Sequence, residues 1–426
     1  MRLEIGSVAA EGLEFAARTA LDGRTLLVDR DEVRRLVLED PHFADVDVHL
    51  ARPGESVRIV HALDVSEPRW KTDGPGGVFP GFVADAGSAG EGHTRRLAGV
   101  AVVTAGEPVP GEPTHFREQI VDMAGPGAPF SPFAETLNVV LHFRPNLAFF
   151  PADGPPPADV LGGTPEAADY NRAVTAAGLK VAAHLGRTAA AATPDEVAVS
   201  ELPPCDPDLL RTVCIYQCQR PFLYGTIAYL PVATLVHPNE CYDGALVGWR
   251  QGQRCTYADQ NHAVLQELGR RHGIDLAFLG CILFSDVTPY RADKERASSA
   301  AARLARLLGA QAAIFLGVNG SNYAVDTMLA VQKCEQLGIK TTVLYYDVGN
   351  GRDDPGFIFA LPEADAIVCT GSRDRALTLP PLERVIGSDT LLHPTQDAHG
   401  EVTVPVRYIH NACAVQGYNR LTTRFH

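Results

Sequence analysis

The sequence is poor in features that mark several large classes of protein. Lys and Arg number 37 against 51 Asp and Glu, which gives a formal net charge of −14 over 426 residues. Such an excess of negative charge repels a phosphate backbone and an anionic lipid surface. The sequence also has no run of about 18 apolar residues, the minimum for a membrane-spanning helix. We therefore expect a protein that binds neither nucleic acid nor membrane.

Cysteine pairs and leader segments are missing as well. The nine cysteines are scattered and form no CxxC pair, which favours reduced thiols over a disulfide framework. Cys214 and Cys218 lie four residues apart on a predicted strand, about 13 Å, so we expect core thiols. Residues 1–21 interrupt every apolar stretch with Glu or Gly, so no signal-peptide core forms. These patterns predict a cytoplasmic protein that takes reducing equivalents from another chain.

Several catalytic motifs are also absent. The chain has no Walker loop and no GxSxG elbow, and its fourteen histidines show no HExxH spacing. The glycines of 74–77 and 125–127 are better explained as tight turns than as an anion cradle. The segment 317–320 follows a strand and precedes a helix, but its dinucleotide fingerprint is incomplete. We predict no metal site from the sequence.

The apolar patterns that are present divide the chain into three parts. Residues 1–150 contain short alternating or apolar runs, which predict a β-rich α+β domain with helices at 12–21 and 31–40, the latter capped by Asp31. Residues 151–206 contain a proline-rich linker and a connecting helix over 165–186. Residues 207–426 alternate apolar strands and helices, which predicts an α/β domain with a mostly parallel sheet covered on both faces.

Two kinds of candidate site residue follow from these patterns. Ligands collect at the carboxyl ends of parallel strands, which makes Asn319 and Asp347 candidate substrate-binding residues. Cys255 lies in a polar loop within 243–262, next to Arg250 and Arg254, and positive charge lowers the pKa of a thiol. The sequence therefore predicts a reactive thiol at Cys255, with a half-buried loop cysteine as the alternative.

Many segments of the chain resemble one family, the substrate-specific component B of glycine, sarcosine and betaine reductases. They occur nearly from end to end, at residues 1–6, 51–59, 64–69, 74–81, 102–106, 122–128, 193–197, 243–247, 256–261, 292–299, 337–343, 351–353 and 379–387. The most unusual are DVSEPR at 64–69, DGALV at 243–247, TYADQN at 256–261 and ADKERASS at 292–299.

The resemblance implies a proprotein that cleaves itself before a cysteine, which becomes a pyruvoyl group. An N-to-S acyl shift, β-elimination and hydrolysis would leave a ketone able to activate a substrate amine. Family members carry an Asn-Cys dipeptide just after the DGAxV segment, whereas this chain has GWRQ at 248–251. Only Cys255 remains in the loop, preceded by Arg254. A self-derived pyruvoyl group at Cys255 would therefore require a relocated cleavage.

We therefore interpret the chain as an oligomeric component-B-like subunit that cleaves a C–N bond of a small amine or amino-acid-like substrate reductively. Its partner would be a second subunit bearing a selenocysteine or cysteine. Cys255 would be the catalytic residue, Arg250 or Arg254 would bind a carboxylate, and three residues would orient the substrate: Tyr257, Gln260 and Asn261. The alternatives are a non-catalytic scaffold or substrate-binding subunit and a biosynthetic enzyme recruited from this family.

Overall fold

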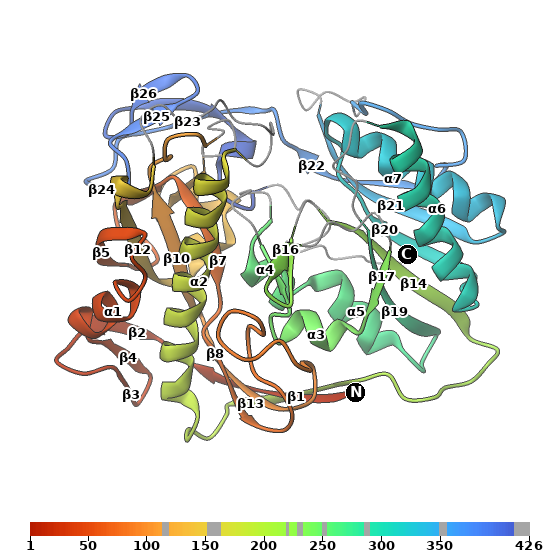
Figure 1. Cartoon of the computed structure of the whole chain (residues 1–426), viewed down its shortest axis with the longest axis horizontal. Coiled ribbons are helices and arrows are strands. Elements are labelled where there is room, and N and C mark those ends of the chain that lie inside the picture. Colours follow the sequence, from red (N-terminus) through yellow and green to blue (C-terminus); the bar gives the residue numbers. More distant parts are fainter. Residues whose placement is uncertain are drawn as a thin grey trace.

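The computed structural model describes residues 1–112, 119–150, 163–218, 221–227, 233–248, 254–284, 290–348 and 356–412. Within these ranges the chain has a mixed α/β fold (Figure 1). Two four-stranded sheets and helix α2 occupy the left of the view, and a six-stranded sheet with its helices occupies the right. No helix of the described ranges combines the length and the apolar content that a membrane crossing requires.

Two mixed sheets build the first part of the molecule. One has the order β13-β1-β9-β8, formed by Glu196–Glu201, Arg2–Ala9, Gly92–Ala98 and Arg69–Asp73. The other has the order β5-β12-β10-β7, formed by Phe43–Ala51, Leu137–Pro145, Val100–Gly106 and Ala62–Ser66. The β-rich character predicted for this part is confirmed.

Besides these two sheets and the six-stranded sheet, the described ranges contain five smaller sheets. Two of them, β2-β4-β3 and β11-β6-β24, are formed by Gly12–Phe15, Thr25–Val28 and Ala20–Asp22, and by Ile120–Asp122, Val57–Val60 and Arg384–Ile386. A third, β16-β15-β18, is formed by Thr226–Ile227, Phe222–Leu223 and Leu246–Val247. The hairpins β23-β27 and β25-β26 are formed by Ala376–Leu379 and Val402–Pro405, and by Thr390–Leu392 and Thr395–Asp397.

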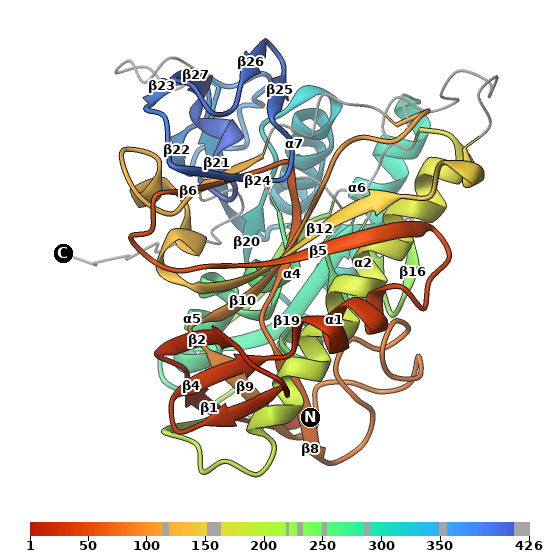
Figure 2. The same ribbon diagram turned by 90° about the vertical axis from the view of Figure 1, so that its left-hand side faces the viewer.

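Helix α2, Pro165–Gly186, packs on the second sheet (Figure 2). Thr164 caps its first turn by accepting a hydrogen bond from the Ala167 backbone, and Pro165 needs no donor at the first helical position. Its small apolar residues share one core with alternate residues of β5 and β12. The helix predicted over 165–186 is confirmed, and helix α1, Arg30–Val37, lies beside it.

A six-stranded sheet forms the second part, in the order β17-β19-β14-β20-β21-β22. Its strands are Thr234–Val236, Leu276–Phe284, Leu210–Gln217, Ala312–Leu316, Lys340–Asp347 and Ile367–Ser372. All neighbouring strands pair in parallel except β17 and β19. The mostly parallel sheet that the apolar runs predict is therefore confirmed.

Helices cover both faces of this sheet. Helices α6, Arg291–Leu307, and α7, Ser321–Gln336, pack on the face that carries Val213 and Ile215. The opposite face, with Cys214 and Tyr216, joins a core shared with the first part of the chain and with α5, Ala263–Arg271. Two short helices, α3 at Pro238–Tyr242 and α4 at Thr256–Gln260, lie between the two parts.

Some local predictions were wrong. Residues 12–21 were expected to be helical, but 12–15 form strand β2. Leu13 is buried there, and it is the register partner of Leu26 on the parallel strand β4. Helix α1 is capped by the Asp29 carboxylate rather than by Asp31, which lies in its first turn. The apolar run 77–86 favours a strand by its pattern, but it forms turns and one isolated bridge, because Phe79 and Gly81 have positive φ of 52° and 84°.

The division at residues 150 and 206 stays a prediction, but several contacts cross it. Strand β13 pairs with β1, and β24 pairs in parallel with β6. Buried Arg58 forms an ion pair with Asp122, 2.8 Å from its Nε, and donates to the backbone carbonyls of Pro380 and Ala398. The last described segment of the chain therefore packs back on the first.

Candidate functional site

The candidate site lies where helix α4 begins. Cys255 precedes α4 in an extended conformation, with φ of −143° and ψ of 161°, and its carbonyl accepts from the backbone N–H groups of Ala258 and Asp259. Gly248 passes close by: a Cβ on it would lie 2.9 Å from Cys255 Cα and 3.0 Å from Asp64 Oδ1. A side chain at 248 would therefore collide with the backbone of the candidate catalytic residue.

Asp64 reaches this position from strand β7. Its Oδ1 accepts from the Thr256 backbone N–H at 2.8 Å, and its Oδ2 accepts from the Thr256 hydroxyl at 2.7 Å. Burial raises the pKa of Asp64 to about 7, although both bonds from Thr256 favour the charged form. A carboxyl group that can gain and lose a proton near neutral pH therefore lies beside Cys255.

Arg254 is tied down on the other side of Cys255. Its Nη2 lies 2.8 Å from Asp259 Oδ2, and its guanidinium carbon lies 5.2 Å from the centre of the Tyr216 ring. The Tyr216 hydroxyl donates to Asp259 Oδ1 at 2.7 Å. Burial raises the pKa of Asp259 to about 6, and Arg254 opposes that shift. The structure thus has two buried carboxyl groups with raised pKa values flanking Cys255.

One guanidinium nitrogen of Arg254 takes no part in the ion pair with Asp259. Its Nη1 is buried and donates no hydrogen bond to the described residues. The guanidinium lies close enough to the Cys218 thiol to lower its pKa, although burial dominates and raises that pKa to about 12. A buried cationic donor without an acceptor is costly, so it marks a place where an anionic group would bind favourably.

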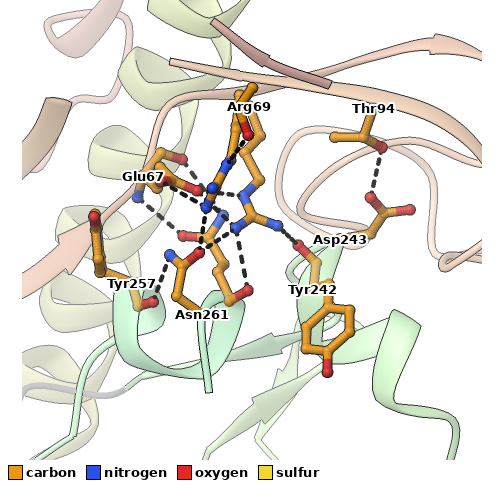
Figure 3. Close-up of polar contacts among 10 residues, drawn as sticks. Glu67, Arg69, Thr94, Tyr242, Asp243, Tyr257 and Asn261 are labelled. Carbon is orange, nitrogen blue, oxygen red and sulfur yellow. Dashed lines mark hydrogen bonds and ion pairs between the residues drawn. The ribbon is translucent and has the colours of Figure 1, made fainter. Parts of the chain in front are cut away.

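A second polar network holds α4 against strand β8 (Figure 3). Arg69 forms an ion pair with Glu67 at 2.6 Å, and it also donates to the carbonyl oxygens of Tyr242 and Gln260 and to the Asn261 side chain. Glu67 and Arg69 are each 1% exposed. Because such buried charges are tolerated only when paired, this network fixes the position of α4.

The three predicted substrate-orienting residues are brought together, but the amide groups of two of them, Gln260 and Asn261, are engaged in hydrogen bonds within the protein. Gln260 accepts from the Glu67 backbone N–H at 2.9 Å and donates to the Glu67 carbonyl at 3.4 Å. Asn261 accepts from Arg69 and Arg96 and donates to the Tyr257 carbonyl. The Tyr257 ring packs edge-on against Phe133, with centroids 5.4 Å apart. Their contacts support a positioning role.

The reason given for a reactive Cys255 was wrong. Arg254 does lower the pKa of the thiol, but burial, followed by the charge of Asp64, outweighs it and raises the pKa well above its usual value. Cys255 is fully buried, as are Cys214 and Cys218, whose prediction as core thiols is confirmed. Within the described ranges, these thiols form no set of three metal ligands at bonding distance.

The residues predicted at strand ends occupy a separate place. Asn319 follows β20 and donates to the carbonyls of Tyr346 and Gly356, while its Oδ1 accepts from the Ile358 backbone. Asp347 ends β21 and accepts from the Gly356 N–H at 2.6 Å. The two side chains meet at Gly356, not at Cys255. Arg250 lies outside the described residues.

Sequence reasoning missed Asp64, Glu67, Arg69 and Asp259 as parts of the site. The first three belong to DVSEPR at 64–69, and Asp259 belongs to TYADQN at 256–261. Both segments carry the family resemblance, and the structure shows that they pack against each other. The available signal was that resemblance, since no spacing rule relates side chains 192 residues apart, as Asp64 and Thr256 are.

Comparison with known proteins identifies the class to which this fold and site belong. The family described as glycine/sarcosine/betaine reductase component B subunits matches residues 1–424, and the chain belongs to this family. It is 33% identical to the glycine reductase complex component B subunits alpha and beta of Acetoanaerobium sticklandii, over the whole of both chains. No solved structure matches the chain.

Two further relatives come from Peptoclostridium acidaminophilum. The sarcosine reductase complex component B subunit alpha is 32% identical over the whole of both chains. The betaine reductase complex component B subunit alpha is 30% identical over 91% of this chain and 88% of the relative. Relatives named for glycine, sarcosine and betaine reductase complexes therefore match this chain to a similar degree.

Proposed function

We propose that this chain is the component-B-like subunit of a multi-component reductase that cleaves a C–N bond of a small amine or amino-acid-like substrate. Family membership supports the reaction class, and the names of the relatives support work within a complex. One observation supports Cys255 as the place of the reaction. Asp64, whose pKa is raised to about 7, accepts a hydrogen bond from the Thr256 backbone at the start of α4, next to Cys255.

A pyruvoyl group, which family membership implies, fits the residues around Cys255. Cys255 is the sole cysteine of 243–262, and Asp64 and Asp259 have raised pKa values suited to moving protons near neutral pH. When present, the group supplies a carbonyl that withdraws electrons from an amine. The network of Glu67 and Arg69 would hold the first turn of α4 in place while the bond between Arg254 and Cys255 breaks.

The buried Nη1 of Arg254 supports an amino-acid-like substrate. It is a cationic donor without an acceptor in the described ranges, and a substrate carboxylate would supply one. Asp64 would take the proton that a substrate ammonium must lose before its nitrogen can react, and would return a proton to the departing amine. An amino-acid-like substrate therefore fits this site, because Arg254 can bind a carboxylate on one side of Cys255 and Asp64 can carry a proton on the other.

The electrons would come from a second subunit in the cytoplasm that bears a selenocysteine or cysteine. Its selenolate or thiolate would form a bond to the substrate carbon while the C–N bond breaks and the amine leaves with a proton. The thiols near Cys255 are poor substitutes, because burial raises the pKa of Cys218, Cys241 and Cys281.

A scaffold or substrate-binding subunit is the second candidate. The full burial of Cys255 and the ion pair of Arg254 with Asp259 favour it, because a break between the two residues would disturb both contacts. On this reading the chain would bind substrate at Arg254 and present it to a partner without forming a carbonyl.

Intact mass under denaturing conditions, before and after reaction with a carbonyl-specific hydrazine, separates the two candidates. We expect fragments 1–254 and 255–426, with a hydrazone on the second, and a single unreactive chain for the Cys255→Ala variant. The Cys205→Ser variant should cleave like the unmodified protein. A single unreactive chain in the unmodified protein would refute the pyruvoyl reaction and leave the scaffold function.

A further inference from the structure

Three potential metal ligands meet on the sheet β5-β12-β10-β7, away from Cys255. Asp47 and His49 are separated by one residue on β5, so their side chains lie on the same face. His142 on β12 is the register partner of Asp47 in the antiparallel pair. One ligand atom from each of the three side chains lies within 4.8 Å of the other two. The face is the one opposite α2, since the intervening Val46 and Val48 pack in the core with that helix.

The two imidazoles lie half-buried and close together on this face. Burial lowers the pKa of both His49 and His142, and His142 also lowers that of His49. Neither ring makes a hydrogen bond to the described residues. No hydrogen bond within the described ranges therefore accounts for the position of these two half-buried imidazoles.

Asp47 supplies a charged oxygen ligand. Burial raises its pKa, but Arg144 and the two imidazoles outweigh this effect, so the net pKa is lowered and the group is a carboxylate at neutral pH. Both contacts from Arg144 go to Oδ2, at 2.6 and 3.2 Å. The Arg144 side chain is 61% exposed and can move into solvent. Oδ1 would then bind a cation while Arg144 keeps or releases Oδ2.

We infer that Asp47, His49 and His142 form a binding site for a divalent transition-metal ion, with Zn²⁺ as the favoured occupant. Two imidazole nitrogens and one carboxylate oxygen suit Zn²⁺, Co²⁺, Ni²⁺ or Cu²⁺, whereas Mg²⁺ and Ca²⁺ prefer oxygen ligands throughout. Ligand atoms of a tetrahedral zinc site lie about 3.4 Å apart. Small rotations of these half-buried side chains bring them to that spacing. Three protein ligands leave one position for water or another group.

Charged groups of both signs act on the two imidazoles. The carboxylates of Asp47, Glu107 and Asp389 act on His142, and so does the cationic Arg144. The cationic groups of Arg384 and Arg30 act on His49. The site therefore lies in a mixed field, and its strongest attraction for a cation comes from the Asp47 carboxylate. This inference is independent of the proposed reductase function, since it involves neither Cys255 nor its neighbours.

Metal titration of the tag-free, chelator-treated chain tests the site. Cys369→Ser serves as the background because Cys369 is an exposed thiol. We expect one equivalent of Zn²⁺ to bind and Co²⁺ to give a visible spectrum without thiolate charge transfer. His49→Gln and His142→Gln should each weaken binding at least about tenfold. His93→Gln is the matched control: it changes a 45% exposed histidine on β9, and should leave binding unchanged.

Thermal unfolding separates loss of the site from loss of the fold. Zn²⁺ should raise the Tm of the background protein and of His93→Gln, but not that of His142→Gln, while the metal-free Tm values should agree. Equal Zn²⁺ binding by the background protein and by the double variant His49→Gln/His142→Gln would overturn the inference. So would the absence of Zn²⁺ and Co²⁺ binding by the background protein.

Discussion

The start of α4 and the carboxyl edge of the six-stranded sheet are both places where a ligand could bind, but they are built differently. At α4, two buried carboxyl groups with raised pKa values, Asp64 and Asp259, flank Cys255. At the sheet edge, the Asn319 side chain donates a hydrogen bond to the Gly356 carbonyl, and Asp347 accepts one from the Gly356 backbone N–H. Groups whose ionisation is shifted by burial can do chemistry, whereas groups saturated by backbone contacts mainly hold a loop.

Breaking the ion pair that holds α4 should have the largest effect. Arg69→Met leaves buried Glu67 with only the longer contact to Arg96, at 3.6 Å, and removes the hydrogen bonds from Arg69 to α4, so we expect a loss of about 3–5 kcal/mol in the free energy of unfolding. In the unprocessed chain, where Cys255 keeps its thiol, Cys255 should also become accessible to alkylation in the native state. Lys294→Met is the matched control, because it breaks the buried pair with Asp326 between α6 and α7.

Both variants should lose stability in urea, but only Arg69→Met should expose Cys255. Peptide mapping after alkylation distinguishes Cys255 from the other thiols. Equal protection of Cys255 in Arg69→Met and in the unmodified protein would show that the network does not position α4.

A methyl group at position 248 tests how tightly the chain packs at Cys255. Gly248→Ala places a Cβ 2.9 Å from Cys255 Cα, so we expect a loss of about 1–3 kcal/mol from overpacking. Gly269→Ala in α5 has no atom within 4 Å of the added Cβ, and should gain about 0.5–1 kcal/mol from helix propensity. Opposite signs in urea unfolding are the expected result, and a neutral Gly248→Ala would contradict the close approach.

The raised pKa of Asp64 predicts how stability depends on pH. Folding raises this pKa from 3.8 to about 7, so the folded state holds a proton that the unfolded chain releases. The protonated Asp64 therefore contributes fully to the free energy of unfolding below pH 3.8. This contribution is lost as the pH rises to 7, and the free energy of unfolding falls by up to about 1.4 kcal/mol per pH unit. Asp64→Asn should flatten this part of the profile, whereas exposed Asp389→Asn should not. Parallel profiles for all three proteins would place the Asp64 pKa near its ordinary value.

The smallest effect is expected at the sheet edge. Asn319→Ala removes three hydrogen bonds to the segment 346–358, with a cost of about 1–2 kcal/mol. Hydrogen exchange should quicken at Ile358, while alkylation of Cys255 stays as slow as in the unmodified protein. Faster alkylation of Cys255 would mean that the two regions act as one site.

Local pattern predicted the second part of the chain better than the first. The continuous apolar runs at 276–284 and 211–218 predicted β19 and β14 closely, because strands buried on both faces need apolar side chains throughout. Residues 12–21 have good helix formers, yet pairing of β2 with β4 overrides that preference. The apolar run 56–63 favours a single strand, but His61, with φ of 53°, divides it into β6 and β7, and no local pattern revealed that break.

The candidate site could be predicted only in part. The loop and Cys255 followed from residue chemistry, but the burial that raises the thiol pKa depends on packing with segments far away in the chain. The alternation of Asp47 and His49 on β5 was visible as a pattern. Placing His142 beside them required the register of β5 against β12, which the sequence does not contain.

The interleaving of the six-stranded sheet bears on what a cut at Cys255 would do. Strand β14 comes before residue 254 in the chain, whereas β19 and β20 come after it. In the sheet, β14 nevertheless lies between β19 and β20. Strand β24 similarly pairs with β6 from the opposite side of the cut. The two pieces would thus remain a permanent heterodimer whose halves share hydrogen-bond ladders. Neither piece could be exchanged for a fresh copy without unfolding, so each molecule would carry its processed terminus for its whole lifetime.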